Sequence, residues 1–294
     1  MFNLAALKYR RALAESGGPI ARIASTPVSI YGHNIYQADA FLTPGLSPRK
    51  PSVEKSSEAD GSGSSASPQT ARDLAVSEAI ARWAFHTERA GPNGRRYGMD
   101  ESGSIKGTVA FPGLFKGQAQ KRAQLEALEL LAVTAWWSGH LKATRSSTLV
   151  PGFEVLQLQH PATFGEVVII YRKAKSGHVS YGYAASESVT GAIARATIEL
   201  ARNEFTVTCH KICGRAKPIA NYLERRCLYF ATPAGHQEFI DRVNSDPQKS
   251  KATWDPLYDG ELTGPWSRYA TVWRTALRLP TQDHLDPDLN FFYW

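Results

Sequence analysis

The hydrophobic pattern of the chain is most continuous between residues 118 and 137, where no glycine, proline or turn pair interrupts it. A stretch of this length predicts one helix of roughly 30 Å. Apolar side chains point in almost every direction around this helix, which predicts burial on nearly all sides. Glu126 and Glu129 nevertheless lie in its middle, three residues apart, after Arg122. Because a buried carboxylate is costly without a metal, a cation or amide donors, the pattern predicts a polar site in an apolar helix.

Two further long helices are predicted over residues 68–89 and 190–205. Ser67 is the expected N-cap of the first, with Pro68 at its first helical position. Shorter helices are expected at about residues 5–14, 220–228 and 234–243. Alternating β-branched and aromatic residues predict a strand pair within residues 21–42 and single strands at about 153–159, 165–174, 178–186 and 268–279.

The order of these elements indicates the fold class. Strands cluster with strands and helices with helices, so we expect an α+β fold with mixed or antiparallel sheets instead of a doubly wound parallel sheet. Residues 43–67 are dominated by Pro, Ser, Gly, Lys and Glu, and we expect a flexible loop there. At 294 residues the chain is long enough for one large domain or two small ones.

Composition narrows the choice of partner and compartment. The net charge of +7 favours anionic partners such as a nucleotide or an acidic peptide, but no long basic run occurs, so nucleic acid is not expected. Three cysteines, an odd number, argue against a disulfide framework and for a reducing compartment. The sequence starts without the features of a signal peptide, and no apolar run is long enough to span a membrane. We therefore expect a cytoplasmic protein.

The three long helices share a pattern of acidic and basic residues at helical spacing. The residues are Glu78 with Arg82, Arg122 with Glu126 and Glu129, and Arg195 with Glu199. Glutamates that converge from neighbouring helices can bind Mg²⁺, and nearby arginines can hold phosphate oxygens in pairs. The ordinary alternative is three amphipathic helices with weak ion pairs along each helix. Spacing alone leaves both interpretations open.

Two other groups of residues could form a ligand site, one for a metal and one for a phosphate. Cys209, His210 and Cys213 could bind a soft metal, but no second pair at zinc-finger spacing follows, which favours core or surface residues. Gly61 and Gly63, with the serines around them, could hold a phosphate before a helix. They lack the lysine of a phosphate-binding P-loop, so an ordinary loop is the simpler interpretation.

Three segments of the chain carry a family resemblance. SPQTARDLAVSEAIARW resembles the first signature of the YcaO domain family, ALELLAVTAWW its second, and GYAASESVTGAIARATIELAR its third. Two flanking segments, ARIASTPVSIYGHNIYQADAF and ERRCLYFATPAGHQEF, are similar to the opening strands and the late helical region of the family. The resemblance covers most of the chain in the right order and implies a single YcaO-like α+β domain over residues 1–294.

The resemblance also implies a function. YcaO proteins use ATP and Mg²⁺ to activate a backbone amide oxygen of a ribosomally made precursor peptide, which yields azolines, thioamides or amidines in products such as bacteriocins. The matching positions imply nucleotide-binding and metal-binding residues but no assigned catalytic residue. The implied nucleotide-binding residues are Glu78, Arg82, Arg195 and Glu199, and the implied metal ligands are Glu126 and Glu129.

Some positions depart from the family pattern. Ala81 stands where the first signature has Glu, and Leu130 replaces the arginine after the second glutamate. The resemblance therefore favours an ATP-dependent cyclodehydratase or a related amide-activating enzyme. The alternative is a catalytically degenerate subunit that binds precursor peptide or scaffolds an active partner protein, as a homo- or hetero-oligomer.

The aromatic residues 291–294 are expected to fill a pocket or to dock on a partner.

Overall fold

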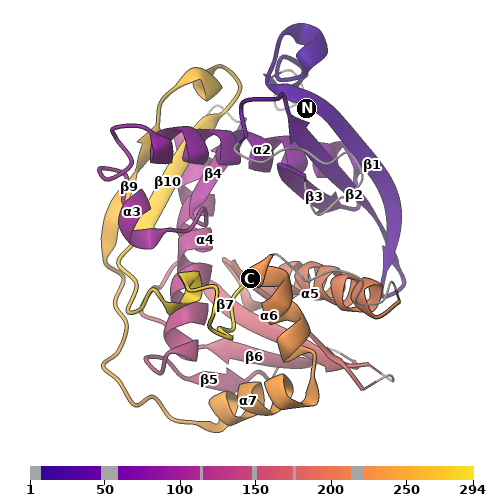
Figure 1. Cartoon of the computed structure of the whole chain (residues 1–294), viewed down its shortest axis with the longest axis vertical. Helices are drawn as coiled ribbons and strands as arrows, with labels where there is room; N and C mark the ends of the chain where they lie inside the picture. The colour runs from indigo at the N-terminus through magenta and orange to yellow at the C-terminus, as the bar shows by residue number, and fades with distance from the viewer. Residues whose placement is uncertain (1–7, 48–58, 113–114, 148–150, 175–176, 213–220) are drawn as a thin grey trace. The chain divides into compact units, whose positions relative to one another are not determined.

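The computed structural model describes residues 8–47, 59–112, 115–147, 151–174, 177–212 and 221–294 (Figure 1). The chain divides into two compact units. Unit 1 consists of Met1–Gln124 and Pro256–Ala276, and unit 2 of Leu125–Asp255 and Leu277–Trp294. Helix α4, Lys116–Trp137, runs from the first unit into the second. That residues 1–294 act as one domain stays a prediction.

Unit 1 contains two three-stranded sheets. The first has the order β1-β2-β3 and is antiparallel throughout, and the second has the order β4-β10-β9. The elements are η1 Ala14–Ser16, β1 Ile20–Ile30, β2 His33–Leu42, β3 Gly61–Ser65, α2 Pro68–Ala90, α3 Met99–Ser102, β4 Thr108–Phe111, β9 Pro256–Leu262, η3 Pro265–Arg268 and β10 Thr271–Leu277.

Helix α2 packs on strand β3 through small residues on both sides. A Cβ added at Gly61 would lie 2.2 Å from the carbonyl oxygen of Ala75, and one at Gly63 would lie 2.2 Å from that of Ala71. Only glycine permits this approach of strand to helix. The expectation of a loop over residues 43–67 was therefore wrong for Gly61–Ser65, which forms β3, while residues 48–58 lie outside the described residues.

The predicted start of helix α2 is confirmed. Ser67 precedes the helix in an extended conformation, and its Oγ accepts a hydrogen bond from the backbone N of Thr70 at 3.3 Å. Pro68 occupies the first helical turn, where its missing N–H has no helical partner to lose.

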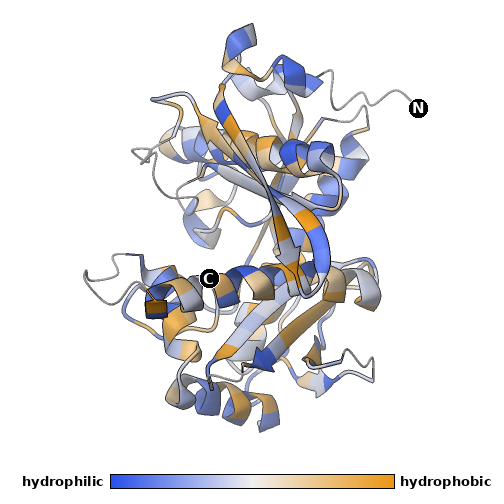
Figure 2. Ribbon diagram, turned by 90° about the vertical axis from the view of Figure 1, so that its right-hand side faces the viewer, coloured by the Kyte–Doolittle hydropathy of each residue, from blue (hydrophilic) through white to orange (hydrophobic). Residues whose placement is uncertain are grey.

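Unit 2 is built on a four-stranded antiparallel sheet with the order β5-β6-β7-β8. The elements are β5 Ala143–Arg145, β6 Glu154–Leu158, β7 Glu166–Lys173, β8 Val179–Ser186, α5 Val189–Ile212, α6 Tyr222–Phe230, α7 Pro233–Asn244 and η4 Asp283–Leu285. Four consecutive residues of β7, from Val167 to Ile170, are fully buried, as expected for a strand covered on both faces. Figure 2 colours the ribbon by hydropathy and shows hydrophobic segments in both strands and helices.

Both faces of this sheet are covered. Helix α5 packs on β7 and β8, and Gly182 of β8 allows the close approach. The opposite face contributes Ile169 and Tyr181 to a hydrophobic core that also contains Leu131 of α4. The alternation of side chains along the strands thus places α4 and α5 on opposite faces of the sheet.

The aromatic residues 291–294 belong to the core of unit 2. Phe292 is fully buried and packs edge-on against Trp136, with ring centroids 5.6 Å apart. The backbone N of Trp294 donates to the hydroxyl of Tyr183 at 2.8 Å. The segment therefore fills the interior of its own unit, which is the first of the two expected roles.

The predicted fold class is confirmed, because the described residues form an α+β structure with antiparallel sheets. The long helices begin and end within a few residues of their predicted limits, except at the end of α5, which continues to Ile212. No helix in the described part of the chain has the length and apolar character needed to cross a membrane.

Candidate functional site

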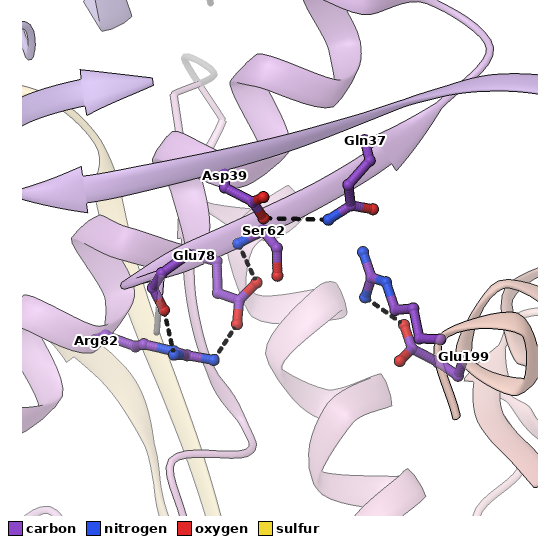
Figure 3. Close-up of polar contacts among 8 residues, drawn as sticks. Gln37, Asp39, Ser62, Glu78, Arg82 and Glu199 are labelled. Atoms are coloured by element: carbon purple, nitrogen blue, oxygen red, sulfur yellow. Dashed lines mark hydrogen bonds and ion pairs between the residues drawn. The ribbon is translucent and has the colours of Figure 1, made fainter. Parts of the chain in front are cut away.

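One face of the β1-β2-β3 sheet carries a group of polar side chains (Figure 3). Gln37 pairs with Ser64 and Asp39 with Ser62 in the β2–β3 register. Since the neighbouring glycines of β3 face helix α2, Ser62 and Ser64 project from the opposite face. Ser64 Oγ donates to Gln37 Oε1 at 2.5 Å, and Gln37 Nε2 donates to Asp39 Oδ1 at 3.2 Å. The result is a hydrogen-bonded polar strip across two strands.

The predicted Glu78–Arg82 pair forms next to this sheet (Figure 3). Arg82 Nη2 lies 2.5 Å from Glu78 Oε1, and the second carboxylate oxygen accepts from the backbone N of Ser62 at 2.9 Å. Arg82 Nη1 donates to the carbonyl oxygen of Ala59 at 3.2 Å. The side chains of Glu78 and Arg82 keep 37% and 24% of their surface exposed, so both remain accessible to a ligand.

Residues of the second and third signature helices meet at a single residue of β8. Glu129 of α4 is buried, and its Oε2 accepts from the backbone N of Ala185 at 3.2 Å. Arg195 of α5 donates from Nη1 to the carbonyl oxygen of Ala185 at 2.9 Å. Of the partners expected for a buried carboxylate, a metal, a cation or an amide donor, the end of strand β8 supplies an amide donor.

The remaining two predicted residues lie in more open surroundings. Glu126 is half-buried one turn before Glu129 on α4. Glu199 is exposed, and its Oε1 accepts from Arg202 Nη1 at 2.8 Å, so the ion pair of α5 forms at i,i+3 and involves Arg202 and not Arg195. Glu78 and Arg82 belong to unit 1 and the other four predicted residues to unit 2.

The metal role of Glu126 and Glu129 stays a prediction. Among the residues that the structure describes, no three or more His, Cys, Asp or Glu side chains lie close enough together to hold a metal ion. Three of the four predicted carboxylates, those of Glu78, Glu126 and Glu199, are half-buried or exposed and are oxygen donors of the type that Mg²⁺ prefers.

The cysteine motif does not gather into a metal site in the described part of the chain. Cys209 is half-buried, and its neighbour His210 lies 3.6 Å from a carboxylate oxygen of Glu224. Cys213 lies outside the described residues. Burial raises the pKa of the Cys227 thiol to about 12, which keeps this sulfur protonated near neutral pH.

The sequence singled out the serines beside Gly61 and Gly63 as possible phosphate contacts, but not the polar strip that Ser62 and Ser64 form with Gln37 and Asp39. Its only signal is the alternation of serine with glycine in GSGSS, which is also typical of a loop. Asp39 and Gln37 lie in a segment whose apolar alternation predicts a strand but not a site.

Replacing Glu129 with Leu is expected to lower the free energy of unfolding by about 2 kcal/mol, because the buried N–H of Ala185 loses its acceptor. Urea denaturation measures this change. Glu129→Gln is the matched control, since the amide oxygen can still accept, and it should cost less than half as much. Equal losses in both variants would show that the bond to Ala185 is not what Glu129 contributes.

Comparison with known proteins yields fold similarity only. No family model and no curated protein matches the sequence. A chain of the E. coli microcin synthetase McbBCD complex superposes with a TM-score of 0.52 at 12% sequence identity, covering 87% of this chain and 86% of that one. A chain of the same complex with pro-MccB17 bound gives a TM-score of 0.42 at 15% identity, covering 58% of this chain and about half, 53%, of that one. The chain is thus similar in fold, over most of its length, to a chain of the microcin synthetase complex.

Proposed function

We propose that this protein takes part in the biosynthesis of a modified, ribosomally made peptide. The observation that carries the proposal is the fold similarity, over 87% of the chain, to a chain of a microcin synthetase complex. The three signature-like helices and the similar flanks, which occur in the order of the YcaO family, support the same assignment. The substrate would be a precursor peptide, and a partner biosynthetic protein fits the complex in which the similar chain is found.

The activity we propose is ATP- and Mg²⁺-dependent activation of a backbone amide of that peptide. ATP would supply the phosphoryl group that turns the amide oxygen into a leaving group. Arg82 and Arg195 have the donors for phosphate oxygens, because each uses only part of its five N–H groups in the contacts described above. The family resemblance also assigns a nucleotide-binding role to Glu78 and to Glu199. Glu126 and Glu129 would hold the metal, Glu126 with the more accessible carboxylate.

A second candidate function is a non-catalytic subunit that binds precursor peptide or scaffolds an active partner. A specific observation favours it. Glu129 and Arg195 both bond to Ala185, which gives two of the six predicted ligands a role in holding β8 between α4 and α5. In addition, Ala81 and Leu130, which replace charged residues of the family pattern, are buried among apolar neighbours.

Calorimetric titration with ATP, with and without Mg²⁺, tests the proposed activity. We expect Mg²⁺-dependent binding to the wild-type chain and at least about tenfold weaker binding to the Glu126→Gln, Glu129→Gln double variant. Both substitutions keep the hydrogen-bonding shape of the side chain. Glu238→Gln, an exposed carboxylate on α7 that accepts from the Tyr229 hydroxyl, is the control and should bind ATP as the wild type does.

The outcomes separate the two candidates. Equal ATP binding by the double variant and the wild type would remove α4 from the nucleotide site. A folded wild-type chain that binds no ATP, with or without Mg²⁺, would rule out the enzyme and leave the non-catalytic subunit.

A further inference from the structure

Unit 2 contains a cavity of about 390 Å³ beside strands β5, β6 and β7. This volume lies within the range of small-molecule sites in proteins. The side chains with polar groups that line it are Thr144, Gln157, Gln159, His160, Thr163 and Glu166. None of the six predicted nucleotide and metal residues lines it. It therefore needs an explanation of its own.

Glu166 gives this cavity a negative charge. It is half-buried at the start of β7, and its Oε2 accepts from Gln157 Nε2 at 2.7 Å. Gln157 is itself fixed, because it lies within the β6–β7 ladder opposite Val168. None of the described residues that line the cavity is a lysine or an arginine. The carboxylate is thus oriented by a neutral amide and is not neutralised within the cavity.

His160 does not supply the missing positive charge. Its Nδ1 is buried and has no hydrogen-bond partner among the described residues. Burial lowers the pKa of the imidazole, and the nearby Glu166 carboxylate raises that pKa by a smaller amount. Near neutral pH the ring is therefore mainly uncharged, and the cavity keeps the single negative charge of Glu166.

We propose that this cavity binds the guanidinium or ammonium group of a basic ligand, with Glu166 as the counter-ion. A cation that donates to a half-buried carboxylate makes a stronger hydrogen bond than a neutral donor does. The amide and hydroxyl oxygens of Gln157, Gln159, Thr144 and Thr163 can accept the remaining N–H groups of such a ligand. The inference stands independently of the proposed nucleotide site.

Titration of the full chain with L-arginine, L-lysine and L-citrulline, followed by NMR, tests this assignment. Citrulline has nearly the shape of arginine but carries a neutral urea in place of the guanidinium. We expect saturable shifts of the His160 ring signals with arginine or lysine, and at least about tenfold weaker binding of citrulline. Glu166→Gln should weaken binding of the cation by a similar factor and remove the preference over citrulline.

Glu154→Gln is the matched control. Glu154 lies in the same sheet but is exposed and paired with Arg145 at 2.8 Å, outside the cavity lining, so this variant should bind as the wild type does. In Glu166→Gln the pKa of His160 should also fall, because the carboxylate that raises it is gone. An unchanged pKa would show that the Glu166 carboxylate does not act on the His160 ring, and unchanged binding of arginine by Glu166→Gln would overturn the proposal.

Two further results would overturn it. One is a folded wild-type chain that shows no saturable binding of arginine or lysine, and the other is equal binding of arginine and citrulline. N-acetyl-arginine amide separates two sources of the same cation. Binding as tight as that of free arginine indicates a basic side chain carried by a peptide, and a clear preference for free arginine indicates a small metabolite. Both of these results support the cation site.

Discussion

Replacing Arg226 with Met is expected to lower the free energy of unfolding by about 3–5 kcal/mol. Arg226 is 1% exposed and has no carboxylate partner in the contacts described. Its guanidinium donates to four backbone carbonyl oxygens, those of His284 and Asp286 at 2.7 Å, Tyr293 at 3.0 Å and Leu289 at 3.1 Å. Methionine fills much of the same space but cannot donate, so the carbonyl groups of the buried residues His284 and Tyr293 lose this partner.

Urea denaturation followed by tryptophan fluorescence measures this loss, and Arg225→Met is the matched control. Arg225 lies next to Arg226 on helix α6 but is exposed and makes one bond, from Nη2 to the carbonyl oxygen of Pro287 at 3.0 Å. Its loss should cost less than about 1 kcal/mol. If the two variants lost the same stability, the four carbonyl contacts would not be the reason for burying this charge.

Gly182→Ala is expected to lower the free energy of unfolding by about 3 kcal/mol. A Cβ at this position of β8 would lie 2.1 Å from the carbonyl oxygen of Ala196 and 2.4 Å from the backbone N of Leu200. Both atoms belong to the backbone of helix α5, which cannot move as a single side chain can. The helix must therefore shift away from the sheet, and the bond from Arg195 to Ala185 is expected to lengthen or break.

Thermal and urea denaturation of this variant are best compared with Gly117→Ala. Gly117 lies in helix α4, and a Cβ there would meet no atom within 4 Å, so alanine should leave stability unchanged or raise it by up to about 1 kcal/mol. A small effect of Gly182→Ala, comparable with that of Gly117→Ala, would mean that α5 and β8 tolerate a wider spacing than the structure indicates.

Much of the helical structure could be predicted because its signals are local. The start of α2 follows from its capping residue Ser67, and α4 follows from its uninterrupted apolar pattern. The end of α5 was placed too early, since the β-branched residues 206–208 lower helix propensity although the helix continues through them. Strand β9 was missed because Pro256, Asp259 and Gly260 are typical of loops, whereas pairing with β10 stabilises the strand.

For the site residues, too, features that depend on neighbouring residues could be predicted, and contacts between distant segments could not. The sequence indicated that a carboxylate such as Glu129 needs a partner if it is buried, but the partner, Ala185 N, lies 56 residues away in the chain. The glycines of β3 were taken for loop residues because only the position of α2 explains them. Arg195 and Glu199 have the spacing of an ion pair, yet Glu199 pairs with Arg202, which is three positions away and equally within reach, and Arg195 donates to the carbonyl oxygen of Ala185 in β8.

The discontinuous make-up of unit 1 has a consequence for synthesis on the ribosome. Strand β4 pairs with β10, so Thr108 is matched with Arg274 across a segment that contains most of unit 2. Ribosomes deliver the chain from its N-terminus at about 5–20 residues per second, so β4 leaves the exit tunnel well before its partner is made. During that interval its hydrogen-bonding edge is open to other strands. The β4 edge therefore depends on chaperones, or on aggregation being slow, until strand β10 has emerged.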